Sequence, residues 1–148
     1  MNKSLTTKEI GSALITFHDN VETVKKDASN PYFKSNYASL DNILETIKVP
    51  LKESGLSFAQ FPEGLSGLST ILMHESGEWI ESAYIIPLAK QDPQGAGSAI
   101  TYMRRYALGA ILGLATEEDD DANSASTPIV KKGKAVKGVE DVEGDPFA

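Results

Sequence analysis

The chain has 148 residues, 41% of them hydrophobic, a formal net charge of −7 and no cysteine. This length suits one small domain, or one domain and a tail, and the lack of cysteine excludes disulfides and thiolate zinc sites. No apolar run approaches the roughly 18 residues that a membrane-spanning helix requires, and MNKSLTTKEIGS lacks the apolar segment of a secretory signal. We therefore expect a protein that works in a reducing cytoplasm.

The acidity is concentrated towards the C-terminal end. Residues 117–148 contain nine Asp and Glu against four Lys, a balance of −5. Residues 1–116 contain twelve Asp and Glu against ten Lys and Arg, a balance of only −2. The net charge therefore does not exclude a local basic surface on the first 116 residues.

The first part of the chain predicts a helix and then a loop. Residues 6–27 repeat apolar side chains at helical spacing, and Thr6 with Glu9 makes a capping-box pattern. Residues 27–39, DASNPYFKSNYAS, predict a loop, because the Asn-Pro dipeptide favours a turn. The expected buried stripe of the helix is Ile10, Ala13, Leu14, Phe17, Val21 and Val24.

A second helix is expected to begin at Ser39 or Asp41. Pro50 should kink or restart it, and Gly55 should end it. Its apolar stripe is Leu40, Ile43, Leu44, Ile47 and Leu51.

The next segment changes from helical to strand-like periodicity. LSFAQF, LSTILMH and EWIESAYIIPL predict three antiparallel strands in a meander, the last two joined by a tight turn at residues 75–78. The glycine-rich AKQDPQGAG predicts a loop, followed by a helix from about Ser98 to Leu114. The fold class is therefore α+β, with N-terminal helices before a β-β-β-α core.

Beyond residue 121 the chain has few large apolar residues and many small or charged ones. Such a segment cannot bury enough surface to offset its ordering entropy, so we expect a disordered acidic tail. The predicted division is a domain at residues 1–120 and a flexible tail at residues 121–148.

No pattern of covalent or acid–base catalysis is present, so we expect no catalytic residue, no metal and no cofactor. His18 and His74 are far apart and have no metal-binding neighbour pattern, and there is no nucleophile elbow or phosphate-binding P-loop. The acidic run 117–121 could hold a metal in a nuclease. A solvated acidic linker is the better interpretation, because consecutive acids in a flexible segment are poorly preorganised.

The paired arginines of SAITYMRRYALGAIL have two interpretations. Arg104 and Arg105 flank the helical stripe that faces the core, with Tyr102 and Tyr106 on the same outer half. They could be surface arginines in helix ion pairs, or a phosphate-contacting pair beside aromatics on which bases stack. Two weak patterns favour the second: PYFKSNYAS repeats the mixture of aromatic, basic and amide groups, and DPQGAGS offers backbone N–H groups to an anion beside a helix N-terminus.

The stretches NPYFKSNYASLDNILETIKVPLKESGL, HESGEWIES and DPQGAGSAITYMRRYALGAILGLATEEDDDAN resemble the Erf family of bacteriophage single-strand annealing proteins, over roughly residues 5–123. The resemblance implies a non-enzymatic protein of the bacterial host cytoplasm that binds single-stranded DNA and anneals complementary strands without ATP. It also implies a β-β-β-α core and assembly of subunits into a ring or filament. The DNA-contacting positions that it implies are Tyr32, Lys34, Ser35, Tyr37, Gln94, Ser98, Tyr102, Arg104, Arg105 and Tyr106, of which Tyr106 is the tyrosine most expected to be buried.

The C-terminal stretch EDVEGDPFA looks like the acidic tip of bacterial single-stranded DNA-binding proteins, which docks on replication and repair partners. Asp145, Pro146 and Phe147 would make that contact, although Ala148 removes the terminal carboxylate from Phe147. A solvated tail that keeps the protein soluble is an equal alternative. The tip also supports a second function, a replication-type protein that coats strands and recruits host proteins through its tail.

Overall fold

A computed structural model describes residues 1–87 and 92–118 of the chain. The predicted disordered tail and the domain boundary at residue 120 lie outside these residues. The elements in chain order are β1 (Asn2–Lys3), α1 (Lys8–Asn20), β2 (Ala28–Asn30), β3 (Ser35–Tyr37), α2 (Leu40–Glu53), β4 (Leu56–Glu63), β5 (Gly67–His74), β6 (Trp79–Ile85) and α3 (Pro93–Leu112). The α+β class expected from the sequence is confirmed.

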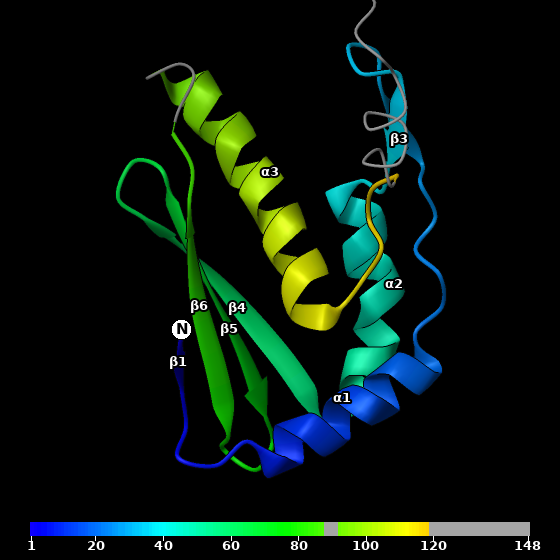
Figure 1. Cartoon of the computed structure of the whole chain (residues 1–148), viewed down its shortest axis with the longest axis vertical. Coiled ribbons are helices and arrows are strands. Elements are labelled where there is room, and N and C mark those ends of the chain that lie inside the picture. The colour runs from blue at the N-terminus through cyan, green and yellow to red at the C-terminus, as the bar shows by residue number, and fades with distance from the viewer. Residues whose placement is uncertain (88–91, 119–148) are drawn as a thin grey trace, which may run out of the picture. The chain divides into compact units, whose positions relative to one another are not determined.

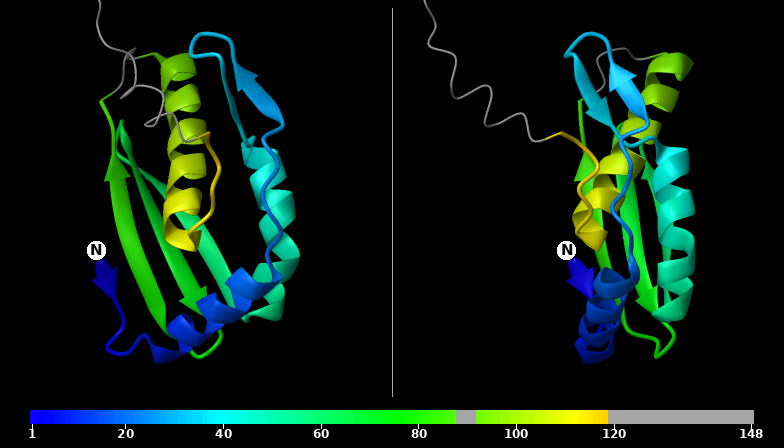
Figure 2. Two further views of the ribbon diagram at one scale, coloured as in Figure 1. Left: turned by 45° about the vertical axis from the view of Figure 1, so that its right-hand side comes forward. Right: turned by 90° about the vertical axis from the view of Figure 1, so that its right-hand side faces the viewer.

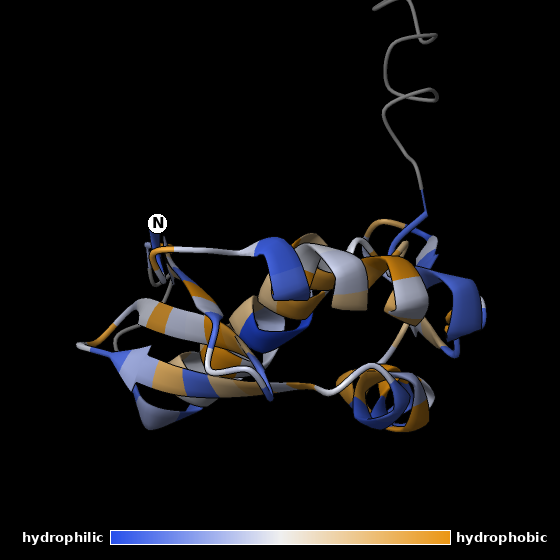
Figure 3. Cartoon of the chain, turned by 90° about the horizontal axis from the view of Figure 1, so that it is seen from below, coloured by the Kyte–Doolittle hydropathy of each residue, from blue (hydrophilic) through white to orange (hydrophobic). Residues whose placement is uncertain are grey.

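The main sheet is antiparallel, with the strand order β1-β6-β5-β4. The three predicted strands pair with their neighbours in chain order, and a turn at residues 75–78 joins β5 to β6. Phe58, Leu72 and Ile80 stand side by side across the sheet and pack against the core. Hydrophobic and hydrophilic residues alternate along the strands, and Figure 3 shows them as orange and blue bands. The prediction of three strands is incomplete, because the two-residue strand β1 adds a fourth at the edge of β6.

The helices cover one face of this sheet. α3 and α1 pack on β5, whereas α2 packs on β4 and also contacts α1 and α3 (Figures 1 and 2). The core between these layers contains Ile10, Ala13, Phe17, Val24, Ala38, Ile43, Ile47, Leu51, Leu56, Leu72, Leu108 and Leu112. Apolar residues from all three helices and two strands of the sheet therefore fix where α3 lies.

Helix α1 is shorter than predicted. It ends at Asn20, and Val21 is extended at φ −75° and ψ 130° while its N–H closes the last turn on the Phe17 carbonyl. The predicted helix to residue 27 was wrong beyond this point. Val21, Thr23 and Val24 are β-branched and lose side-chain freedom in a helix, and an extended segment still buries Val24.

The predicted capping box of α1 was also wrong. The Thr7 side chain, at the N-cap position, makes no capping hydrogen bond. Instead Glu78, from the β5–β6 turn, accepts hydrogen bonds from the Ile10 backbone N–H (3.0 Å) and the Thr6 hydroxyl (2.7 Å). A buried carboxylate from the turn before β6 therefore accepts from the helix N-terminus and complements its dipole.

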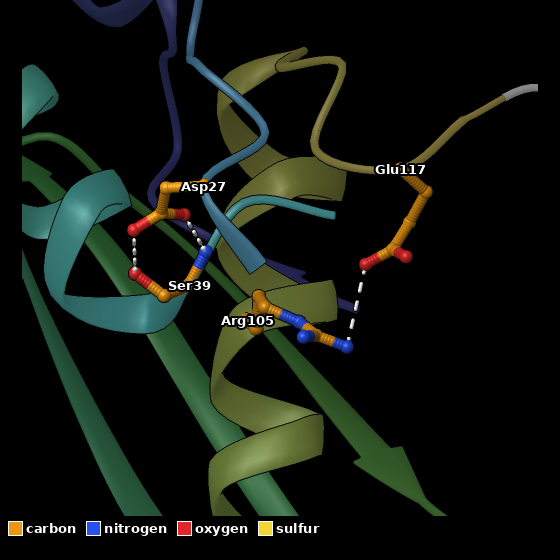
Figure 4. A network of polar contacts seen from close by, with 4 residues as sticks. All are labelled: Asp27, Ser39, Arg105 and Glu117. Carbon is orange, nitrogen blue, oxygen red and sulfur yellow. Dashed lines mark hydrogen bonds and ion pairs between the residues drawn. The ribbon is translucent and has the colours of Figure 1, made fainter. Parts of the chain in front are cut away.

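The segment predicted as a loop at residues 27–39 contains a β-hairpin. Strands β2 and β3 pair from Ala28↔Tyr37 to Asn30↔Ser35. At its base Asp27 accepts hydrogen bonds from the Ser39 N–H and hydroxyl, both at 2.7 Å (Figure 4). Ser39 in turn caps α2 by accepting from the Asn42 N–H. The hairpin is thus tied to the start of α2, which begins and ends where the sequence predicts and continues through Pro50.

Candidate nucleic-acid interface

The β2–β3 hairpin lies beside two stretches that are distant from it in the sequence, α3 and the segment that follows α3. The segment 114–118, which we call the acidic strap, follows α3 and runs along β3. The Ala38 N–H donates to the Thr116 carbonyl at 2.8 Å, and the Glu118 N–H donates to the Asn36 carbonyl at 3.3 Å. Tyr37 and Glu117 form an antiparallel bridge. The hairpin, α3 and the acidic strap therefore build one surface (Figure 1).

Arg105 lies at the centre of this surface, in a cage of aromatic rings. Its guanidinium carbon is 4.1 Å from the centroid of the Tyr37 ring, 5.4 Å from that of Tyr106 and 5.8 Å from that of Tyr102. Its Nη2 also pairs with Glu117 Oε1 at 3.3 Å (Figure 4). Only 13% of the side chain is exposed, so Arg105 joins the three segments rather than projecting freely into solvent.

Burial governs the ionisation of the groups around Arg105. It raises the pKa of Glu117, and the nearby charges of Arg105 and Lys26 oppose that rise. Burial also raises the pKa of Tyr106, helped by a hydrogen bond with Tyr102. The two tyrosine rings stack with their centroids 4.2 Å apart. Tyr106, the tyrosine most expected to be buried, is half-buried, whereas Tyr102 is exposed.

Glu118 attaches the acidic strap to the hairpin. Its carboxylate accepts from the Asn36 backbone N–H at 3.1 Å and from the Asn36 side-chain amide at 2.9 Å. The backbone bond is the larger cause of the lowered pKa of Glu118, and the charge of Lys26 adds to it. The first two acids of the run therefore bind groups of this chain.

Arg104 points to a different neighbour from Arg105. Its Nε donates to Gln60 Oε1 at 3.4 Å, and its carbonyl accepts from Gln60 Nε2 at 3.2 Å. Gln60 Nε2 also donates to the Thr70 hydroxyl at 3.1 Å. Arg104 is half-buried against β4. The two side chains point about 100° apart around α3 and contact different neighbours.

The hairpin turn holds the most exposed aromatics of the surface. Tyr32 is 88% exposed and Phe33 is 69% exposed, with their rings edge to face and 5.3 Å between centroids. The Asn30 side-chain oxygen accepts from both of their backbone N–H groups, which fixes the turn. Lys34 has a left-handed φ of 52°, and Ser35 begins β3. Two aromatic rings and one cation are thus presented to solvent by this turn.

The glycine-rich segment does not provide the anion-binding loop that the sequence suggested. α3 begins at Pro93 instead of near Ser98, and the Gly95 N–H donates to the Asp92 carboxylate at 2.6 Å. A carboxylate at the helix N-terminus takes the place that an anion would occupy. Gln94 and Ser98 are exposed and lie on the same helical stripe as Tyr102, four residues apart.

A family model described as the ERF superfamily matches residues 10–141. The chain belongs to the ERF superfamily. The match spans the hairpin, α3 and the acidic strap, and it agrees with the phage and recombination role that the motifs implied. No curated protein and no solved structure matched the chain.

Among the described residues, no group of three His, Asp or Glu side chains could hold a metal ion. No helix of the described part is long and apolar enough to cross a membrane. Asp145, Pro146 and Phe147, the expected partner contact, lie outside residues 1–87 and 92–118.

The structure of the ERF chain adds residues that the sequence analysis missed. Phe33 shares the hairpin turn with Tyr32, Asn36 binds the acidic strap, and Gln60 holds Arg104. Glu117 was assigned to a solvated linker, yet it pairs with Arg105. Phe33 could have been found from the motif around it, whereas the other three depend on contacts between distant segments.

Proposed function

We propose that this protein binds single-stranded DNA and promotes the annealing of complementary strands in phage recombination, without ATP. The observation that carries the proposal is the meeting of the hairpin, α3 and the acidic strap around Arg105, in a chain that belongs to the ERF superfamily. Aromatic faces next to cations are what sequence-independent binding of single strands requires.

The proposed mechanism is physical and involves no covalent step, so we propose no enzymatic activity. Lys34 and Arg105 supply positive charge to the phosphates, and binding should weaken as salt rises because counterions are released. Tyr32, Phe33 and Tyr102 offer exposed ring faces for stacking, which is tolerant of sequence. Bases held by stacking keep their pairing edges available. The DNA strand then cannot fold back on itself, and a second strand can pair with it.

Assembly of several subunits belongs to the same proposal, as a ring or filament that aligns one strand. The face of the sheet opposite α3 supports it, because Phe61 and Ile85 are exposed there, and Trp79 and Met73 lie on the same face. A second copy that covers these apolar side chains would remove them from water. Light scattering of the purified protein measures the number of subunits.

The deciding experiment is annealing of two complementary oligonucleotides, one carrying a fluorophore and the other a quencher, in EDTA without nucleotide. We expect the wild type to accelerate annealing. Lys34→Asn should bind single strands more weakly and lower the slope of log K against log salt by about 0.7. Asn tolerates the left-handed backbone of residue 34, so the change removes charge without adding strain. Lys48→Gln on the exposed side of α2 loses the same charge and serves as the control.

The outcomes of this experiment separate the alternatives. Tight binding that slows annealing would support a replication-type coating protein instead, with partners recruited through the C-terminal tip. Cleavage that appears only with a divalent metal would indicate a nuclease. Wild type that neither binds nor anneals would contradict both DNA-binding proposals.

A further inference from the structure

The acidic strap covers the cation that the proposed function needs most. Arg105 is only 13% exposed because Tyr37 and Tyr106 lie against its guanidinium and Glu117 pairs with Nη2. A carboxylate and a phosphate present the same kind of acceptor to a guanidinium. A DNA phosphate therefore competes with Glu117 for the guanidinium of Arg105.

The attachment of the acidic strap is weak at the point where it covers Arg105. Within the described part of the chain, Arg105 Nε and Glu117 Oε1 are buried and have no hydrogen-bond partner. The ion pair reaches Glu117 Oε1 only through Arg105 Nη2, at 3.3 Å. Buried polar groups that are incompletely bonded reduce the net stability of such a contact. A ligand that bonds Arg105 with better geometry can therefore compete with Glu117.

The acidic strap lies beyond the last residue of α3, so its release from the hairpin does not require the helix to unwind. Its backbone is tied to the hairpin by two hydrogen bonds, of which the one from Glu118 to Asn36 is long at 3.3 Å. Gly113 ends α3 in the left-handed region at φ 65° and forms the junction with the strap. Glycine allows the backbone to change direction there at low steric cost. Release also breaks the contact of the strap with α3 at Gly109, where an added Cβ would meet the Thr116 hydroxyl at 3.2 Å.

We propose that the acidic strap is a displaceable cover, in which Glu117 holds the place of a DNA phosphate on Arg105 and gives it up when a single strand binds. This inference rests on the proposed function and adds regulation to the same site. The free energy of DNA binding then includes the cost of releasing the strap, which lowers the affinity for any one DNA strand. A lower affinity favours the exchange of DNA strands on the protein, which annealing requires.

The test compares affinities for a fluorescent single-stranded oligonucleotide at one salt concentration. Glu117→Gln should bind about two- to fivefold tighter than wild type, the gain expected when one partly exposed ion pair no longer competes. Glu53→Gln, exposed at the far end of α2, removes the same charge and should match wild type. In the Arg105→Ala background, Glu117→Gln should leave the affinity for the oligonucleotide unchanged, because the competing ion pair is already absent.

A second measurement does not depend on variants that alter the fold. Hydrogen exchange at the Ala38 and Glu118 amides follows the two bonds between the strap and the hairpin. We expect both amides of the wild type to exchange faster when the oligonucleotide is added. Equal affinity of Glu117→Gln and wild type would contradict the proposal that the strap is a displaceable cover. Amides that stay protected from exchange in the complex would contradict it as well. Absence of DNA binding by every variant would instead refute the proposed function itself, and the cover with it.

Discussion

At the level of single residues, the hairpin turn allows DNA binding to be tested without disturbing the fold. Tyr32 and Phe33 are exposed and contact mainly each other, so their removal should leave the fold intact. If bases stack on them, Phe33→Ala should weaken single-strand binding by about 1–3 kcal/mol, roughly 5- to 150-fold in Kd. Fluorescence anisotropy measures the affinity. Leu65→Ala, an exposed apolar side chain in the β4–β5 turn, is the matched control. Equal affinities of the two variants would argue against stacking at the turn.

The residues of the candidate site could be predicted only in part. Tyr37, Tyr102, Arg105 and Tyr106 come together as the motifs suggested. Arg104 lies outside this cluster, because adjacent residues of a helix point about 100° apart and its side chain meets Gln60 of β4. Glu117 lies on a segment whose pairing with β3 depends on tertiary contacts. Local sequence patterns contain no information on either.

At the level of elements, α1 offers a direct comparison of a local cap with a tertiary one. Glu78 accepts from the Ile10 N–H and the Thr6 hydroxyl on different oxygens, and an amide has only one oxygen. Glu78→Gln should therefore lower the melting temperature by several degrees, since one donor at the helix N-terminus loses its acceptor. Glu9→Gln, the acid of the capping-box pattern, should change it by less than a degree. Thermal unfolding followed by circular dichroism measures both. A larger fall in melting temperature for Glu9→Gln than for Glu78→Gln would instead indicate that the capping box of Thr6 and Glu9 stabilises α1.

The elements that periodicity predicts well are those that bury a whole face. α2 and strands β4 to β6 have enough apolar positions to define their period. The hairpin was missed because its strands have three residues each and are held by Asp27 and Glu118 from outside. The start of α3 was missed because glycine disfavours a helix by about 1 kcal/mol relative to alanine. The Asp92 cap and Pro93 in the first turn favour a helical start there despite the glycines.

At the level of the whole molecule, three carboxylates connect segments that are distant in sequence. Asp27 ties the hairpin to α2, Glu78 ties the sheet to α1, and Glu118 ties the acidic strap to the hairpin. Hydrogen bonds from backbone N–H groups are the leading cause of a lowered pKa in each of the three. The folded protein therefore holds these groups ionised at a pH where the unfolded chain begins to protonate them.

This arrangement predicts loss of stability in mild acid. A carboxyl whose pKa is lowered by folding stabilises the protein above its ordinary value, 3.8 for Asp27 and 4.5 for Glu78 and Glu118. That stabilisation disappears as the pH falls through the lower, folded value. Glu117 acts in the opposite direction: its raised pKa favours folding below its ordinary value of 4.5 and disfavours it above. Because three such groups oppose one, the melting temperature should fall as the pH is lowered from about 5 to about 3. The triple variant Asp27→Asn, Glu78→Gln, Glu118→Gln should melt lower at neutral pH and show a flatter profile, and an unchanged slope would mean that other carboxyls dominate.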